Sequence, residues 1–167
     1  MRRALTALIF MAFSAPALAQ ATHPIVGVWV TDEQAEITVA PCSAGYCGYL
    51  SKIVIPEARL VNTDKKAADI DIASLTDVNN KDPNLQQRPL LGLEMLSLNR
   101  ALSANAFEGE IYNPEDGNTY YGKLELVDQQ QVKLTGCALV VLCQSQAWFR
   151  APKIDPPPIP AKLIPRP

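Results

Sequence analysis

The sequence predicts a small all-β protein whose antiparallel strands close into a barrel. Short runs of β-branched and aromatic residues recur along the middle of the chain, and clusters of turn-forming residues separate them. Aromatic residues mark both ends of this region, because Gly27–Trp29 opens it and Trp148–Arg150 closes it. Such ends are expected where the first and last strands of a barrel meet. A closed barrel has an interior, so the first functional question is what that interior holds.

Roughly eight runs have the length and composition of strands, the number at which a barrel can just enclose one small ligand. The predicted strands are Ile25–Thr31, Ala35–Ala40, Tyr49–Ile55, Leu90–Leu96, Phe107–Tyr112, Tyr120–Leu126, Gln131–Gly136 and Ala147–Arg150.

In the first half of the barrel, composition and alternation define the strands. The first run is continuously apolar and rich in β-branched residues. The second alternates, which places Ile37 and Val39 on one face. Residues 41–48 are expected to turn the chain, and the third strand is expected to end at Pro56.

The second half contains the strongest hairpin signal. Asn113–Gly117 combines Asn, Pro, Asp and Gly, so it is expected to join two antiparallel strands. Between the halves, the polar stretch 57–89 shows no strand pattern, apart from a short helical turn expected near Leu85–Arg88. Connections of that length in compact domains are often functional or mobile.

Strand alternation predicts which side chains face the interior. One face of three consecutive strands is mostly aliphatic, and the Tyr120 hydroxyl is its one polar handle, as suits an apolar ligand. Gly109, Gly122 and Gly136 lie in the same strands, where they either leave room for a ligand or let the barrel bend. The candidate ligand-binding wall is Phe107, Ile111, Tyr120, Gly122, Leu124, Leu126, Val132 and Leu134.

The two ends of the chain differ from the barrel. Residues 1–19 have an Arg-containing start, an apolar stretch from Leu5 to Phe13 and a small-x-small site at Ala17–Ala19, as a signal peptide cleaved after Ala19 has. The apolar stretch is too short to span a bilayer. The barrel domain is then 20–150, and the protein is expected in the periplasm.

Residues 151–167 form a separate tail. Seven of these seventeen residues are proline, so the tail cannot join the sheet. Composition favours an unpacked, disordered tail, and the alternative is a docking motif for a protein partner.

Four cysteines in an exported chain predict two disulfides. Three connectivities are possible in principle. The spacing favours two local bridges, Cys42–Cys47 and Cys137–Cys143, because each pair can close a hairpin.

Gly27, Trp29 and Arg150 are predicted to close the barrel. Glycine leaves space beside the first strand, and a guanidinium from the last strand can stack on the indole. The alternative is that Arg150 simply faces solvent.

Composition and motifs disfavour several classes of function. Loss of Arg2 and Arg3 with the signal peptide changes the formal net charge from −2 to −4, and no basic cluster suits nucleic acid. No metal site or cofactor is predicted: His23, in a start expected to be frayed, is the single histidine, and the Asp77–Asp82 stretch lacks EF-hand spacing. Glu108, Glu110 and Asp116 fit a solvated strand face better than a catalytic pair, so no enzymatic activity is expected.

Four segments carry a resemblance to a known family: Ile25–Trp29, Arg88–Leu93, Ile111–Tyr120, and Gly136–Cys137 through Gln146–Arg150. Together they resemble an exported bacterial family called domain of unknown function 2147. The resemblance covers nearly all of residues 24–150, and the Tyr-Asn-Pro-x-x-Gly-x-x-Tyr segment is its most specific part. It implies a lipocalin-like barrel in the periplasm with no established activity.

These observations favour a periplasmic, lipocalin-like binding protein for a small apolar or amphipathic ligand. The alternative is a non-catalytic envelope protein with a filled barrel, acting through residues 57–89 or the Pro-rich tail. Alternation does not decide between them, because it does not show whether the inward side chains leave a void. The oligomeric state is not predicted.

Overall fold

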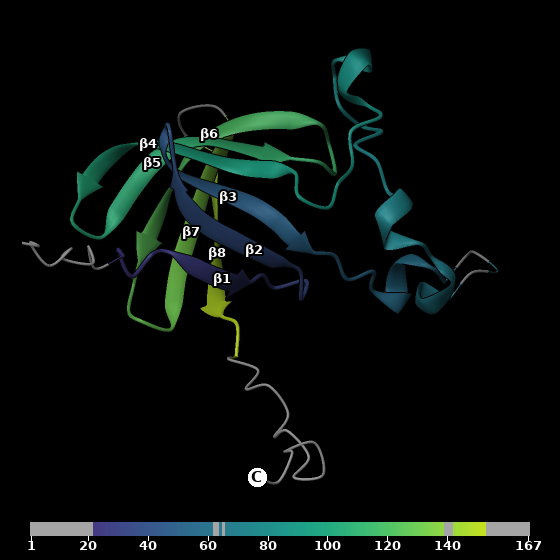
Figure 1. The fold of residues 1–167 in the computed structure, drawn as a ribbon, viewed down its shortest axis with the longest axis horizontal. Helices are drawn as coiled ribbons and strands as arrows, with labels where there is room; N and C mark the ends of the chain where they lie inside the picture. The colour runs from purple at the N-terminus through teal and green to yellow at the C-terminus, as the bar shows by residue number, and fades with distance from the viewer. Residues whose placement is uncertain (1–21, 62–63, 65, 139–141, 153–167) are drawn as a thin grey trace, which may run out of the picture.

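A computed structural model describes residues 22–61, 64, 66–138 and 142–152. Eight strands in this part of the chain form a closed antiparallel barrel, in which neighbours in sequence pair and β8 pairs with β1 (Figure 1). The predicted fold class is therefore confirmed. The signal peptide, and the tail beyond Pro152, lie outside the described residues. The strands are β1 (Gly27–Val30), β2 (Glu36–Cys42), β3 (Gly45–Lys52), β4 (Glu94–Ser103), β5 (Ala106–Asn113), β6 (Asn118–Leu126), β7 (Gln131–Ala138) and β8 (Leu142–Arg150).

Several strand boundaries differ from the sequence prediction. The expected turn at 41–48 is mostly strand, because β2 and β3 pair as far as Cys42 and Gly45 and leave only two residues between them. β3 ends at Lys52, before Pro56, where the chain leaves the barrel. β4 begins at Glu94, so the apolar residues at 90–93 belong to the preceding connection.

The connection from β3 to β4 protrudes on one side of the barrel (Figure 1). It contains four short 3₁₀ turns: η1 (Glu57–Arg59), η2 (Ala67–Asp69), η3 (Ile72–Ser74) and η4 (Pro83–Leu85). Asp71 and Asp82 cap η3 and η4 by accepting hydrogen bonds from backbone N–H groups. The helical turn expected at Leu85–Arg88 corresponds to η4, which shares only Leu85 with the predicted range. It begins earlier because Asp82 caps it and Pro83 occupies its first position.

The barrel is closed at the end where the chain enters and leaves it. Arg150 pairs with Trp29 across β1 and β8, and its guanidinium lies 4.0 Å from the centre of the Trp29 ring. The same group donates to the carbonyl oxygens of Pro24, at 2.5 Å, and Val26, at 3.2 Å. Gly27 has a φ of +142°, and a Cβ there would collide with Arg150 Nη1. Glycine is therefore required for the guanidinium to cross the barrel end.

Aromatic rings cover the remainder of this closed end. The Phe107 ring lies edge-on to those of Tyr46 and His23, with centroid distances of 4.8 and 5.1 Å. His23 Nε2 lies 2.7 Å from the Ala104 carbonyl oxygen in the β4–β5 turn. The expectation that His23 lies in a frayed start is wrong, because these contacts hold it against the barrel.

The half of the interior next to the closed end is solid. Its side chains come from six strands and are almost fully shielded from water, so they form a packed core. They include Trp29, Val39, Leu98, Leu124, Val132 and Trp148.

Both disulfides have the pairing that the spacing predicts. Cys42–Cys47 staples the β2–β3 hairpin, and Cys137–Cys143 staples the β7–β8 hairpin. Successive connections of an up-and-down barrel lie at opposite ends, so these two bridges lie at opposite ends of this one. Among the described residues, none of the helices has the length and apolar character needed to cross a membrane.

Candidate functional site

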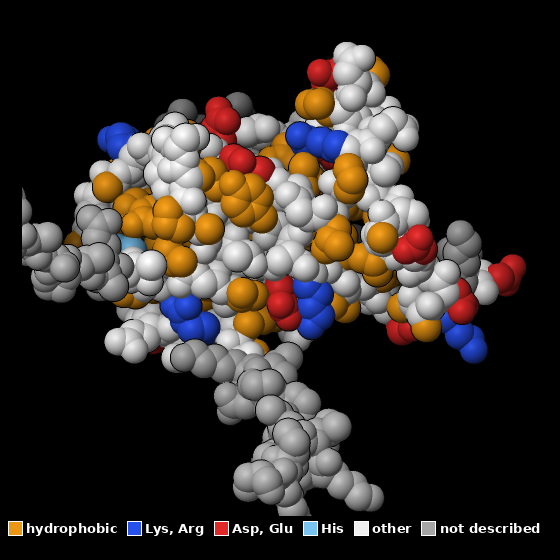
Figure 2. Space-filling model, viewed as in Figure 1, with side chains coloured by type: hydrophobic (Ala, Val, Ile, Leu, Met, Phe, Trp, Pro, Cys, Tyr) orange, Lys and Arg blue, Asp and Glu red, His pale blue; other side chains and the backbone are white. Residues whose placement is uncertain are grey.

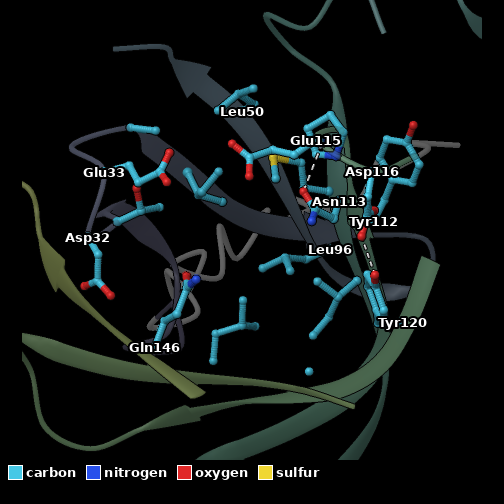
Figure 3. Close-up of a pocket in the computed structure, with 18 of the residues that line it drawn as sticks. Asp32, Glu33, Leu50, Leu96, Tyr112, Asn113, Glu115, Asp116, Tyr120 and Gln146 are labelled. Carbon is cyan, nitrogen blue, oxygen red and sulfur yellow. Dashed lines mark hydrogen bonds between the residues drawn. The ribbon is translucent and has the colours of Figure 1, made fainter. Parts of the chain in front are cut away.

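The other end of the barrel opens into a cavity of about 910 Å³ (Figure 3). Its mouth is formed by the β1–β2, β3–β4 and β5–β6 connections, together with Ala138 at the end of β7 and Leu142 at the start of β8. Its deeper wall is formed by inward-facing side chains of the strands. Most of these deep side chains are apolar: Ile37, Leu50, Leu96, Ile111, Leu134 and Trp148.

The structure divides the predicted ligand-binding wall along the barrel axis. Ile111, Tyr120 and Leu134 line the cavity. The other predicted side chains face inward nearer the closed end: Leu124, Leu126 and Val132 belong to the packed core, and Phe107 belongs to the aromatic cluster.

The glycines of the wall have different roles. A Cβ at Gly122 would collide with the backbone oxygen of Thr135 and lie 2.5 Å from Ile111 Cδ1. Gly122 therefore permits close approach of neighbouring strands. A Cβ at Gly136 would meet nothing nearer than Ile111 Cδ1, at 3.6 Å, and Gly136 itself lines the cavity. The missing side chain at Gly136 is therefore space within the cavity.

Tyr120 and Asp116 form a hydrogen-bonded pair on one side of the cavity, and the phenol donates to the carboxylate (Figure 3). Burial raises the pKa of the Asp116 carboxyl, but hydrogen bonds from Tyr120 and Asn118 and the charge of Lys81 bring it below its ordinary value. The bond to Asp116 raises the pKa of Tyr120. Near neutral pH the carboxylate is thus ionised and the phenol protonated. The Tyr120 hydroxyl was expected to be the polar group available to a ligand. In the structure it already donates its hydrogen bond to Asp116.

Gln146 lies on the opposite side of the cavity (Figure 3). The Trp148 indole N–H donates to Gln146 Oε1 at 3.1 Å. Trp148 is almost completely buried, whereas Gln146 is exposed to the cavity. This glutamine was not among the predicted site residues, although alternation along β8 from Trp148 would place it inward.

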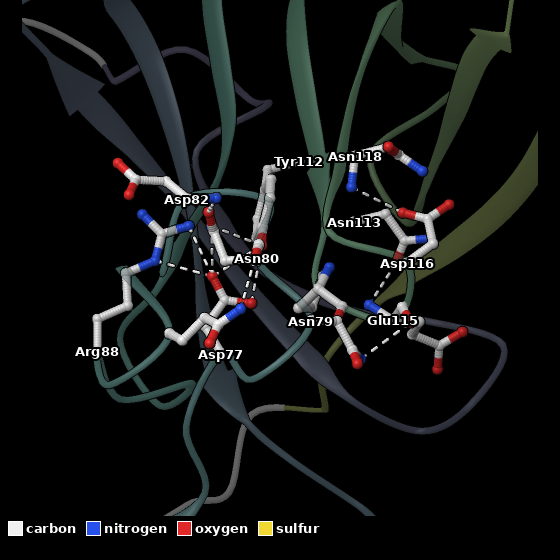
Figure 4. A network of polar contacts seen from close by, with 12 residues as sticks. Asp77, Asn79, Asn80, Asp82, Arg88, Tyr112, Asn113, Glu115, Asp116 and Asn118 are labelled. Atoms are coloured by element: carbon white, nitrogen blue, oxygen red, sulfur yellow. Dashed lines mark hydrogen bonds and ion pairs between the residues drawn. The ribbon is translucent and has the colours of Figure 1, made fainter. Parts of the chain in front are cut away.

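A buried carboxylate anchors the long connection beside the cavity mouth (Figure 4). Asp77 is 1% exposed and accepts hydrogen bonds from the Tyr112 hydroxyl at 2.7 Å and Asn80 Nδ2 at 2.8 Å. It also accepts from Arg88 Nε and pairs with Arg88 Nη2, both at 2.9 Å. Burial, followed by the bond to Asp77, raises the pKa of Tyr112. The Asp77 charge is therefore matched by a cation and by neutral donors, as a buried carboxylate requires.

A second contact ties the same connection to the β5–β6 turn. Asn79 Nδ2 donates to the carbonyl oxygens of Pro114, at 3.1 Å, and Glu115, at 3.0 Å. A Cβ on Gly117, where φ is +67°, would collide with the Asn79 carbonyl oxygen. Since Asn79, Tyr112 and Pro114 all line the cavity, these contacts fix one side of its mouth.

Apolar side chains are also present at the mouth. Figure 2 shows them gathered where the long connection leaves β3. Ile53, Val54, Ile55 and Pro56 line the cavity there, and Val54 is 37% exposed. Across the mouth, Leu142 is 63% exposed. An amphipathic molecule would therefore meet apolar surface before reaching the interior.

The carboxylates considered for catalysis are separated by the barrel wall. Asp116 lines the cavity, whereas Glu108 lies on the outer face, paired with Arg100. Glu108 is 7% exposed, so the expectation of a solvated side chain is wrong at this position: Arg100 covers it. The described residues contain no group of three or more His, Cys, Asp or Glu side chains able to hold a metal ion.

Comparisons with known proteins match both the sequence and the fold. The model of a family described as uncharacterized protein conserved in bacteria, DUF2147, matches residues 27–150. A structure of the Helicobacter pylori protein HP1028, described as belonging to the lipocalin family, superposes with a TM-score of 0.60 at 17% sequence identity. The similarity covers 79% of this chain and 86% of that one. The search of curated proteins gives no match.

Proposed function

Because the chain belongs to the bacterial family DUF2147 and has a lipocalin-like barrel, we propose that it is a periplasmic binding protein for a small apolar or amphipathic molecule. The observation that carries the proposal is the cavity of about 910 Å³ at the open end of the barrel. Binding sites for small molecules fall in the range of roughly 300–1,000 Å³ and are predominantly apolar.

The division of the interior supports binding at one end. The packed half joins the strands into a rigid support, while the Asp77 and Asn79 contacts hold the connection that borders the mouth. Largely pre-formed sites order fewer side chains on binding and therefore lose less entropy. The ligand would lie with its apolar part against Leu96, Leu134 and Trp148.

The titration of the cavity pair supports binding rather than catalysis. A general acid or base works best with a pKa near the operating pH. The Asp116 and Tyr120 pKa values are shifted away from neutrality in opposite directions. This pair therefore suits a fixed polar contact more than proton exchange.

The two disulfides support the assignment to an oxidising compartment. If the chain is exported as its N-terminal sequence predicts, the protein recovered from the periplasm will begin at Gln20. N-terminal sequencing tests this, and a chain retaining residues 1–19 would contradict it.

The binding proposal is tested with N-phenyl-1-naphthylamine, an uncharged dye whose fluorescence rises in apolar surroundings. We expect saturable binding with about one site per chain. Gly136→Phe should abolish it, because the new ring points into space that the cavity now occupies. Lys133→Phe is the matched control, since it adds the same ring at an exposed position of the same strand.

Two outcomes would contradict the proposal. Saturable binding that survives Gly136→Phe would place the dye outside the cavity. Absence of binding to the wild-type barrel would favour the alternative role, an envelope protein acting through residues 57–89 or the Pro-rich tail. The exposure of Val61 and Val78 in the long connection is the observation that favours this alternative.

A further inference from the structure

The Gln146 amide has a fixed orientation. An indole N–H is a donor and cannot accept, so its partner in the amide must be the oxygen. The bond from Trp148 Nε1 to Gln146 Oε1 therefore directs the amide NH₂ group away from the indole. Within the part of the chain that the structure describes, that NH₂ group has no hydrogen-bond partner.

The amide lies where the apolar depth of the cavity meets its polar mouth. Gln146 is the cross-strand partner of Leu134, which belongs to the apolar wall, and Trp148 lies two residues deeper on the same face of β8. A molecule whose hydrocarbon part fills the deeper wall would bring its polar end to Gln146. The Gln146 NH₂ group would donate a hydrogen bond to an acceptor oxygen of that polar end. It would form no hydrogen bond with a hydrocarbon chain.

The charge of the lining distinguishes one kind of acceptor from another. Asp32 and Asp116 line the cavity, and no lysine, arginine or histidine lines it among the described residues. Lys81 is not part of this lining, and its charge acts on Asp116. A ligand carboxylate would lose much more hydration free energy than an uncharged oxygen and would gain no cation from these lining residues.

Resting on the proposed binding function, the geometry points to Gln146 as the residue that selects the ligand. We propose that its amide NH₂ group bonds an uncharged acceptor oxygen, such as that of an ester or amide. The ligand class is therefore a neutral amphiphile with an apolar chain and a carbonyl group. Fatty-acid anions, which carry a carboxylate in the corresponding place, are bound more weakly.

The test is displacement of N-phenyl-1-naphthylamine by two competitors of equal chain length, methyl dodecanoate and dodecanoate, at pH 7.5 and below the micelle concentration. We expect the ester to displace the dye at a concentration at least about tenfold lower. Gln146→Leu should weaken the ester by about fivefold to tenfold, the effect of about one hydrogen bond. The readout is the ratio of ester affinity to dye affinity, because the dye has no carbonyl group and loses no hydrogen bond in this variant.

Gln130→Leu is the matched control, because it makes the same substitution at an exposed position of the β6–β7 turn, outside the cavity lining. It should leave the ester affinity unchanged. Equal displacement by ester and anion would overturn the inference, as would a Gln146→Leu variant that binds the ester like wild type. In both of these results the wild-type protein still binds the dye. Failure of the proposed function is different, because the wild-type protein would then bind no dye and both proposals would be wrong.

Discussion

Arg150 lies with its guanidinium 4.0 Å from the centre of the Trp29 ring, and the two residues are direct partners across β1 and β8. The contact joins the first strand to the last and covers the end of the barrel at which β1 begins and β8 ends. The Trp29 indole N–H is in turn satisfied by the Ile25 carbonyl oxygen at 2.9 Å. The opposite end of the barrel holds the cavity.

This contact predicts that substitutions of Trp29 and Arg150 have coupled effects on the free energy of unfolding. Trp29→Ala should lower the free energy of unfolding by roughly 3–5 kcal/mol, as truncation of a buried aromatic does. Arg150→Ala should cost less, and the double variant should lose about 1 kcal/mol less than the sum of the single variants. Denaturant melts of all four proteins measure this coupling. A coupling energy of zero would mean that stacking on the indole contributes nothing to closure.

The buried carboxylate of Asp77 predicts a large loss of stability when this side chain is removed. Asp77→Ala removes the acceptor for Arg88, Tyr112 and Asn80, so it should destabilise the protein by about 3–5 kcal/mol. Asp82→Ala is the control, because it removes only a helix cap in the same connection and should cost about 1 kcal/mol. Thermal melts compare the two variants. Equal losses of stability would show that the Asp77 network contributes no more than a helix cap does.

The Asp116–Tyr120 pair predicts a particular dependence of stability on pH. The folded-state pKa of Asp116 is lowered, so its stabilising contribution is complete above its ordinary pKa of about 4 and is lost as pH falls through the folded value. The pKa of Tyr120 is raised, so its contribution is complete below about pH 10 and is lost as pH rises through the folded value.

Tyr120→Phe should therefore destabilise the protein most between these limits. The difference from wild type should shrink in acid and in alkali, as denaturant melts from pH 2 to pH 11 would show. In an Asp116→Asn background the acid part of this dependence should vanish. If it persists there, another carboxylate is its source.

The two disulfides predict different functional effects. Cys143 lines the cavity, whereas Cys42–Cys47 staples the β2–β3 hairpin at the closed end. Replacing either pair by serine should cost about 2 kcal/mol of stability, because both loops are short. Replacing Cys137 and Cys143 should also weaken dye binding, while replacing Cys42 and Cys47 should leave it unchanged. Fluorescence titrations decide this, and equal affinities in the two variants would contradict a role for the Cys137–Cys143 bridge in binding.

Local sequence pattern was sufficient to predict the barrel. Alternation in β5 and β6, together with the turn residues at Asn113–Gly117, gave the correct hairpin, in which Tyr112 pairs with Thr119 and Ile111 with Tyr120. The disulfide spacing gave the correct pairing for the same reason, since both bridges close local loops.

The division between core and cavity could not be predicted in this way. Alternation shows that Leu124 and Leu134 both face inward, but their depth along the axis depends on the tilt and pairing of all eight strands. The Asp77 network was missed because its partner Tyr112 is 35 residues away in the chain. Whether Gly122 and Gly136 permit close packing or leave cavity space depends on their neighbours across the sheet, and composition does not show those neighbours.

Native mass spectrometry of the protein purified from the periplasm tests the central claim most directly. A hollow barrel that holds a small molecule predicts a fraction of wild-type chains carrying one adduct of a few hundred daltons, a size that suits a site of this volume. The adduct should persist in Lys133→Phe and be absent from Gly136→Phe, whose added ring fills the cavity. An adduct of equal abundance in wild type and Gly136→Phe would contradict the account, because the bound molecule would then lie outside the barrel.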